Sequence, residues 1–160
     1  MAIHRLHFEE FDEVDYELIA IHTSLEDYRL AYFLNQKLPI LLSKNKNEIQ
    51  VTSKDGAAFF SRFIFENPEK DSYWNLIQNK NEVVLNSNET NQNLFENTMM
   101  SVATKVFVLP EMKKVDFFLK IENPEVATDQ IIKKINSIKS LSAAYSVETN
   151  LIKSKNNLIF

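Results

Sequence analysis

Acidic and basic side chains gather in one short stretch of the sequence, LPEMKKVDFFLKI, residues 109–121. Glu111 and Asp116 supply carboxylates, and Lys114 lies between them. Carboxylate and ammonium groups held at the entrance of a strand can bind a polar ligand or transfer a proton. The same residues can also shape and solvate a turn whose backbone Pro110 restricts. We expect this structural role, and we keep Glu111, Lys114 and Asp116 as candidate catalytic residues.

Two further candidates lie earlier in the chain. His22 stands where an apolar strand gives way to a helix, and Glu26 follows four residues later. A neutral imidazole near a helix N-terminus could act as a proton donor. A histidine at a strand end more often makes one local hydrogen bond. If the two regions met in space, His22 and Glu26 would join the three residues above in a small-ligand or hydrolytic site.

Metal and cofactor chemistry find little support in the composition. The chain has no cysteine, which excludes thiolate nucleophiles, zinc-thiolate sites and iron-sulfur clusters. Its single glycine, Gly56, cannot supply the glycine-rich loops that hold phosphates or dinucleotides. His4 and His7 with Glu9 and Glu10 could bind a divalent metal, but their spacing matches no recognised site. We therefore expect no metal and no cofactor.

The totals indicate an ordinary globular protein. A chain of 160 residues with 44% hydrophobic residues is expected to form a single domain, residues 1–160. Residues 1–13 are expected to be a flexible arm, because six carboxylates within residues 9–17 would repel one another. A net charge of -4 argues against broad nucleic-acid affinity. No apolar stretch is long enough for a membrane span, so we expect a cytoplasmic protein without a membrane partner.

Two helices are predicted from apolar spacing. The first runs over residues 25–37, with Ser24 as its cap and Pro39 ending it. The second begins at Thr128 as cap and carries an isoleucine stripe. The residues expected to face the core are Leu25, Tyr28, Ala31, Tyr32, Leu34 and Leu38 in the first helix and Ile131, Ile132, Ile135 and Ile138 in the second. Leu30 and Phe33 widen the apolar arc of the first helix, which is therefore expected to be deeply seated.

The remaining apolar runs are predicted to be strands. They cover residues 16–23, 39–43, 48–52, 57–65, 72–78, 82–86, 103–109, 115–121 and 141–149, with a further edge strand in the tail 151–160 and an exposed loop at 86–97. In the strand 115–121, Val115 is expected to share a face with Phe117, Leu119 and Ile121. The fold class is therefore α+β: a two-layer, mainly antiparallel sheet with two helices on one face. A ferredoxin-like core with an extra β-hairpin is one form of it.

The segment at Leu109 also resembles a known pattern. Leu109, Pro110 and Glu111, then three residues, then Val115, Asp116 and Phe117, are similar to the signature of the IPExxxVDY family of small bacterial proteins. Leu109 stands for the family's Ile and Phe117 for its Tyr. The stretch IHTSLEDYRLAYFLN is similar to a helix segment of that family. The resemblance implies no activity, since the family is named after a pattern.

These observations favour a non-catalytic protein-binding or regulatory module. The contact would be made through exposed apolar surface or an unpaired sheet edge, and self-association is its simplest form. The site built on His22 and Glu111–Asp116 is the alternative. RNA binding is a third hypothesis, and it depends on a basic patch of Lys133, Lys134, Lys139, Lys153 and Lys155. An aromatic stacking platform for single-stranded nucleic acid could be formed by Phe59, Phe63, Phe65, Tyr73 and Trp74, but core packing is the expected fate of these side chains.

Overall fold

The computed structural model describes residues 15–86 and 101–160. Its elements are ten strands and two helices, besides short 3-10 turns. The helices are α2 (Asp27–Lys37) and α3 (Thr128–Asn136). The strands are β1 (Glu17–Thr23), β2 (Ser43–Lys44), β3 (Ile49–Ser53), β4 (Gly56–Phe60), β5 (Arg62–Asn67), β6 (Ser72–Gln78), β7 (Lys80–Asn86), β8 (Ser101–Phe107), β9 (Phe117–Glu122) and β10 (Leu141–Ser146).

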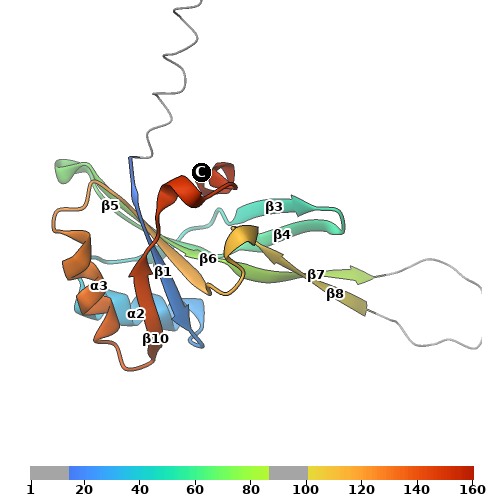
Figure 1. The fold of residues 1–160 in the computed structure, drawn as a ribbon, viewed down its shortest axis with the longest axis horizontal. Helices are drawn as coiled ribbons and strands as arrows, with labels where there is room; N and C mark the ends of the chain where they lie inside the picture. Colours follow the sequence, from blue (N-terminus) through green and yellow to red (C-terminus); the bar gives the residue numbers. More distant parts are fainter. Residues whose placement is uncertain (1–14, 87–100) are drawn as a thin grey trace, which may run out of the picture.

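The described residues form an α+β fold around one antiparallel sheet. Six strands pair in the order β10-β1-β9-β6-β5-β2, and each neighbouring pair is antiparallel. Two hairpins, β3-β4 and β7-β8, form separate two-stranded sheets, at the right of Figure 1. The prediction of a mainly antiparallel sheet with two helices is confirmed.

Both helices cover the same face of the sheet (Figure 1). Leu30 and Leu34 of α2 and Ile131 and Ile135 of α3 are fully buried there, in one apolar cluster with alternate residues of the strands. The strand residues in that cluster include Ile19, Ile21, Trp74, Leu76, Phe117, Leu119 and Ile121. The isoleucine stripe predicted for α3 therefore faces the core.

The opposite face of the sheet holds a second apolar cluster, which the two-layer prediction did not include. The residues of the six-stranded sheet in this cluster are Leu18, Ala20, Ile77 and Phe118. It is covered by the β3-β4 hairpin, by the segment around Leu109 and by the C-terminal segment, through Ile49, Ala58, Phe60, Val108, Leu109, Val115, Ile152 and Leu158. Strand β1 is thus buried on both sides, as its continuous apolar run predicts.

The start of α2 differs from the prediction. The helix begins at Asp27, and Glu26 is its N-cap without a side-chain cap hydrogen bond. Thr23 serves the turn before it, because its Oγ1 accepts the backbone N–H of Leu25 at 3.1 Å. The predicted cap at Ser24 is therefore wrong. Likewise, Ala127 rather than Thr128 is the N-cap of α3.

The face of α2 is also rotated relative to the prediction. Tyr28 and Tyr32 are 59% and 58% exposed, although they were expected in the core. Leu30, which was expected to widen the apolar arc, is fully buried. The three- and four-residue spacing fits both arcs, and tyrosine tolerates solvent because its ring carries a hydroxyl.

The predicted strand 57–65 is two strands in different sheets. The break falls at Ser61, whose backbone pairs with Gln78: the N–H donates to Gln78 Oε1 at 3.2 Å and the carbonyl accepts the Gln78 N–H at 3.1 Å. Phe60 consequently enters the second cluster and Phe63 the first. A continuous apolar run cannot reveal such a break, because the side chains of each half are buried in a different apolar cluster.

Three further strand predictions need correction. The run 39–43 contributes only Ser43 to the sheet, as the first residue of the two-residue strand β2. The tail 151–160 forms 3-10 turns and no edge strand. Val115 lies in the second cluster, opposite Phe117, since the regular strand β9 begins only at Phe117. The predicted arm 1–13 lies outside the described residues, as does nearly all of the predicted loop 86–97.

An asparagine from each helix shields one edge of the sheet. Asn136, the last residue of α3, donates to the Ala144 carbonyl at 3.0 Å and accepts the Ala144 N–H at 2.9 Å. Asn35 of α2 makes the same pair of hydrogen bonds with Leu42, next to β2. Each asparagine side chain makes the two backbone hydrogen bonds that a neighbouring strand would make at that residue. Addition of another strand is thereby opposed at both ends of the sheet.

The aromatic residues of the supposed nucleic-acid platform are scattered. Phe63 and Trp74 are buried in the helix-side cluster, whereas Tyr73 lies on the opposite face of the sheet. Phe59 is exposed on the β3-β4 hairpin. A shared stacking surface is therefore not formed. In the part of the chain that the structure describes, no helix is long and apolar enough to cross a bilayer.

Candidate functional site

The segment Leu109–Asp116, here called the motif loop, connects β8 to β9. Pro110 opens a 3-10 turn that ends at Met112, which agrees with the turn predicted from the proline. Leu109 and Val115 anchor the two ends of the loop, because both side chains are buried in the second cluster. The loop is therefore fixed at both ends by apolar packing.

A buried asparagine holds the loop from the inside. Asn79, in the connection between β6 and β7, is fully buried. Its amide nitrogen donates to the carbonyls of Met112 at 3.0 Å and Val115 at 2.8 Å, and its Oδ1 accepts the Leu109 N–H at 2.9 Å. Its own backbone pairs with Asp116 and Val108. Every buried polar atom at this junction thus finds a partner, as burial requires.

Asp116 ties the loop to β1 and to β7. Its Oδ2 accepts the backbone N–H of Thr23 at 2.9 Å, and its Oδ1 lies 2.9 Å from Lys80 Nζ. The backbone N–H of Asp116 donates to the Ile21 carbonyl at 3.2 Å. This carboxylate therefore closes the end of β1 and pairs with a cation.

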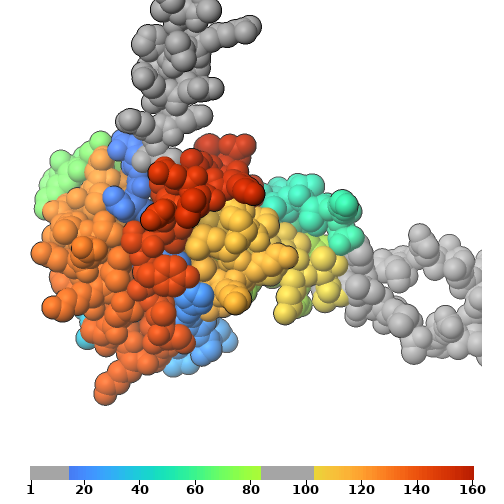
Figure 2. Space-filling view, in the orientation of Figure 1, coloured from blue at the N-terminus to red at the C-terminus, as the bar shows by residue number. Residues whose placement is uncertain are grey.

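Glu111 ties the motif loop to the C-terminal segment. Figure 2 shows the C-terminal segment, in red, lying against the gold part of the surface that includes residues after β8. Its Oε1 accepts the backbone N–H groups of Lys153 and Ser154, both at 2.9 Å, and its Oε2 accepts the Ser154 hydroxyl at 3.0 Å. Partial burial raises the pKa of Glu111, but the hydrogen bonds from Ser154 and Lys153 outweigh burial and hold the pKa below its ordinary value. The carboxylate is consequently held in the ionised form.

Among the residues that the structure describes, the other three candidates, His22, Glu26 and Lys114, make no side-chain hydrogen bond or ion pair with Glu111 or Asp116. His22 Nε2 lies 2.9 Å from the Tyr145 hydroxyl, and the two rings stack with centroids 5.5 Å apart. Glu26 caps α2 with its backbone carbonyl, which accepts the Leu30 N–H. Lys114 is exposed, and only its carbonyl approaches Lys80.

The five candidates are therefore not joined by hydrogen bonds or ion pairs to one another. Within residues 15–86 and 101–160, each side-chain contact of these five leads to a different neighbour. None of the five side chains lines the cavity beside Lys80 and Lys105, the cavity beside Arg62 and Lys120, or the cavity beside Trp74 and Ile131. Asp116 and the end of β1 do meet, as the alternative hypothesis required.

Sequence reasoning missed the two residues that organise this region. Asn79 looked like one of many turn asparagines, and nothing in the sequence distinguishes a buried amide from an exposed one. Lys80 follows it in the connection predicted between the strands 72–78 and 82–86. The only usable signal was the polar triplet NKN between two apolar strands, which also fits a hairpin turn.

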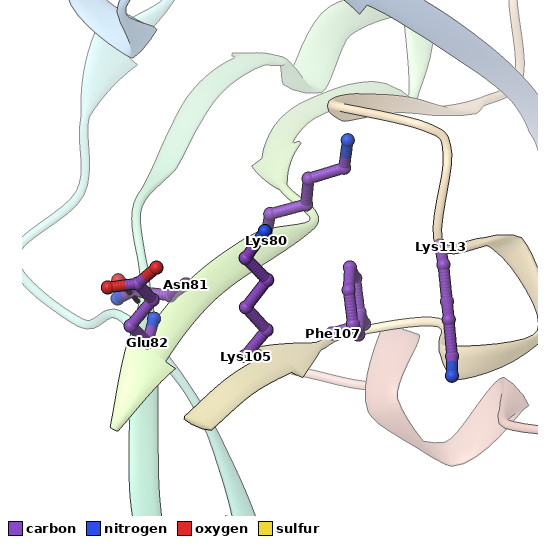
Figure 3. A pocket seen from close by; sticks show the side chains of 6 residues that line it. All are labelled: Lys80, Asn81, Glu82, Lys105, Phe107 and Lys113. Atoms are coloured by element: carbon purple, nitrogen blue, oxygen red, sulfur yellow. Dashed lines mark hydrogen bonds between the residues drawn. The ribbon is translucent and has the colours of Figure 1, made fainter. Parts of the chain in front are cut away.

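A hollow of about 450 Å³ lies beside the motif loop, and we call it the lysine pocket. Its size falls within the range of roughly 300–1,000 Å³ that is typical of ligand sites. Figure 3 shows the six side chains that line it: Lys80, Asn81 and Glu82 from β7, Lys105 and Phe107 from β8, and Lys113 from the motif loop. The pocket thus draws its side chains from three separate segments.

The electrostatics of the lysine pocket contrast with the rest of the chain. The lining holds three lysines and one glutamate, whereas the whole protein carries a net charge of -4. Lys80 is held by Asp116, which fixes its position. The Lys113 ammonium lies 6.0 Å from the centre of the Phe107 ring. In the described part of the chain, neither Lys105 nor Lys113 has a carboxylate within ion-pair distance.

Comparison of the chain with protein-family models, with curated proteins and with solved structures found no match. The described residues contain no group of three or more metal-ligating side chains. His4, His7, Glu9 and Glu10, the residues weighed for a metal, lie outside the described residues.

Proposed function

We propose that the protein is a non-catalytic binding module whose lysine pocket takes an acidic segment of a partner protein. The observation that carries the proposal is the convergence of Lys80, Lys105 and Lys113 around one hollow. Ammonium groups on separate segments attract carboxylates and raise the rate of encounter with an acidic partner. Phe107 adds an apolar wall against which aliphatic parts of a peptide can pack.

A binding role suits this pocket better than a catalytic one. The pocket offers cations but no histidine, and its one carboxylate comes from Glu82. A proton transfer would need an acid or base with a pKa near neutrality within reach of the substrate. The carboxylates of the motif loop, Glu111 and Asp116, are engaged with backbone N–H groups elsewhere. Their contacts support a scaffold role.

Partner recognition through a sheet edge is less favoured. Asn35 and Asn136 occupy the edge positions at Leu42 and Ala144. A partner strand would have to displace them. Self-association, if it occurs, is therefore expected through the lysine pocket, with an acidic stretch of a second copy as the bound segment. Light scattering over a range of protein concentrations tests that form of the proposal.

Binding of a labelled hexaglutamate peptide, followed by fluorescence anisotropy, tests the proposal. We expect saturable binding that weakens strongly when salt is raised from about 50 mM to about 500 mM. Replacement of both Lys105 and Lys113 by glutamate should weaken binding at least about tenfold, which corresponds to about 1.4 kcal/mol. The matched control reverses two exposed lysines of the α3 region, Lys133→Glu with Lys139→Glu, and should bind like the parent chain. Equal weakening in both double variants would contradict a specific pocket.

We further infer that β1, α2, β6, β9, α3 and β10 form a ferredoxin-like core. The order β10-β1-β9-β6 supports this, because the fourth core strand lies beside the first and the third lies between the first and second. The segment β2–β5 and the hairpin β7-β8 would then be insertions before and after the second core strand. The lysine pocket draws two of its three segments from the later insertion.

We also propose that the chain is a divergent member of the IPExxxVDY family, located in the cytoplasm. The pattern's own residues support this, since each has a contact that fixes the motif loop: burial for Leu109 and Val115, the 3-10 turn for Pro110, and backbone hydrogen bonds for Glu111 and Asp116. An authentic family member should therefore fold with the same loop. A structure of one in which the loop is held differently would count against the assignment.

A further inference from the structure

We propose that a polar hollow on the helix-free face of the sheet binds a small zwitterion, such as a free α-amino acid. The hollow measures about 150 Å³ and is called here the sheet-face hollow. The side chains that carry the argument are those of Arg62 and Glu66 from β5, Asn75 from β6, Lys120 and Glu122 from β9, and Phe160 from the C-terminal segment. It is separate from the lysine pocket, with which it shares no lining residue.

The pairing of the strands brings these side chains to one face. Asn75 is paired with Ile64 on one side and with Lys120 on the other, so these three residues form a row across the sheet. Glu66 and Glu122 lie in the next row, on either side of Tyr73. Residues two apart along a strand share a face, so the two rows lie together.

Two cations line the hollow, and one of them has a nitrogen without a hydrogen-bond partner among the described residues. The Nε of Arg62 is buried and has no hydrogen-bond partner among the described residues. Burial lowers the pKa of Arg62, and the nearby charge of Glu66 only partly restores it. Lys120 is 7% exposed, and its ammonium donates to the Leu158 carbonyl at 3.0 Å and lies 3.5 Å from Glu122 Oε1. The same ammonium also lies 4.8 Å from the centre of the Tyr16 ring, so it contributes positive charge to the hollow rather than a free donor.

Phe160 closes one side of the hollow and orients both cations. Its ring centre lies 4.6 Å from the Arg62 guanidinium carbon and 4.8 Å from Lys120 Nζ. A guanidinium group that stacks on a ring keeps its N–H donors in its own plane, where they point past the ring edge. These in-plane donors match the two oxygens of a carboxylate.

The balance of charges selects a zwitterion over a simple anion. Arg62 and Lys120 are opposed by Glu66 and Glu122, so the rim carries two charges of each sign. A phosphate or dicarboxylate would gain from the cations but would be repelled by the carboxylates. A ligand with one carboxylate and one ammonium group satisfies both pairs, and Asn75 can serve either end. The small volume limits the ligand to about the size of one amino acid.

Titration of the full chain with glycine, leucine and glutamine, followed by calorimetry and by the amide NMR spectrum, tests the inference. Acetate and methylamine serve as half-ligands, and inorganic phosphate serves as the simple anion. At least one amino acid should bind at least about tenfold more tightly than either half-ligand, with NMR shifts at Asn75 and Lys120. Binding of phosphate or acetate as tight as that of every amino acid would overturn the inference. So would the absence of amino-acid binding.

Two variants separate ligand binding from folding. Arg62→Lys keeps the charge but loses the planar fork, and Glu66→Gln removes an exposed carboxylate with little change in shape. Each should weaken the amino acid about tenfold, while the thermal midpoint of Glu66→Gln stays near that of the parent chain. The double variant Lys105→Glu with Lys113→Glu should bind the amino acid like the parent chain. Unchanged affinity in both Arg62→Lys and Glu66→Gln would refute the site.

Discussion

The side-chain oxygen of Asn79 accepts the backbone N–H of Leu109 at 2.9 Å, in a site from which solvent is excluded. This hydrogen bond joins the connection after β6 to the first residue of the motif loop. Together with the two bonds that Asn79 donates, it sets the path of the loop from Leu109 to Val115. The position of Lys113, and with it one wall of the lysine pocket, follows from this junction.

Replacement of Asn79 by alanine should lower the free energy of unfolding by about 2–4 kcal/mol, because one buried N–H and two carbonyls lose their partner. Urea denaturation measures the change. The matched control is Asn47→Ala, at an exposed turn position, which should stay within about 0.5 kcal/mol of the parent chain. A loss in the Asn79 variant no larger than in the control would mean that the loop is held by its apolar ends alone.

The contact between Glu111 and the C-terminal segment should weaken in acid. The folded-state pKa of Glu111 lies below the ordinary value of 4.5, so its contribution to stability is present above pH 4.5 and is lost as pH falls through the folded-state pKa. The protection factor of the Ser154 amide should therefore fall below pH 4.5, so that its exchange slows less on acidification than the intrinsic rate does. In Glu111→Gln this extra pH dependence should disappear. If the Glu111→Gln variant kept this extra pH dependence, another titrating group would be its cause.

The ion pair between Lys80 and Asp116 should contribute modestly to stability. Their side chains are 41% and 28% exposed, so solvent screens part of the attraction. A double-mutant cycle with Lys80→Met and Asp116→Asn should give a coupling energy of about 0.5–1 kcal/mol that falls as salt is raised. Asp116→Asn alone should cost more than Lys80→Met, because Asp116 also accepts the Thr23 N–H. The reverse order would contradict the role assigned to Asp116 at the end of β1.

Removal of the two edge asparagines should expose the sheet to strand addition. Asn35→Ala combined with Asn136→Ala frees one N–H and one carbonyl at each edge. We expect the double variant to self-associate at concentrations where the parent chain does not, as seen by size-exclusion chromatography with light scattering. Asn150→Ala, at an exposed position, is the control. A double variant with the elution profile of the parent chain would show that other features protect the edges.

Periodicity alone was enough to predict much of the fold. The alternation in residues 16–23, 72–78 and 115–121 predicts strands at β1, β6 and β9, and the isoleucine spacing after Thr128 predicts the buried face of α3. These elements each face a core on fixed sides, so their patterns are regular. The prediction failed where one apolar stretch of sequence contributes to both apolar clusters. Residues 57–65 divide at Ser61 because Phe60 and Phe63 face opposite clusters.

The candidate site was less predictable. The residues around Pro110 were correctly expected to form a turn, but their partners lie far away in sequence: Thr23 and Lys80 for Asp116, and Ser154 for Glu111. Such long-range hydrogen bonds leave no local pattern. Lys80, Lys105 and Lys113 likewise belong to three ordinary polar positions, and only the folding of the chain brings them to one pocket.

An amide NMR titration of the full chain with hexaglutamate tests the central claim most directly. That claim is that the lysine pocket binds acidic protein segments while the motif loop serves as its scaffold. We predict saturable shift changes at the amides of Lys80, Lys105 and Lys113, with His22 and Glu26 unmoved. Shift changes centred on His22 and Glu26, or none at all at peptide concentrations of about 1 mM, a level that detects even weak complexes, would contradict the account.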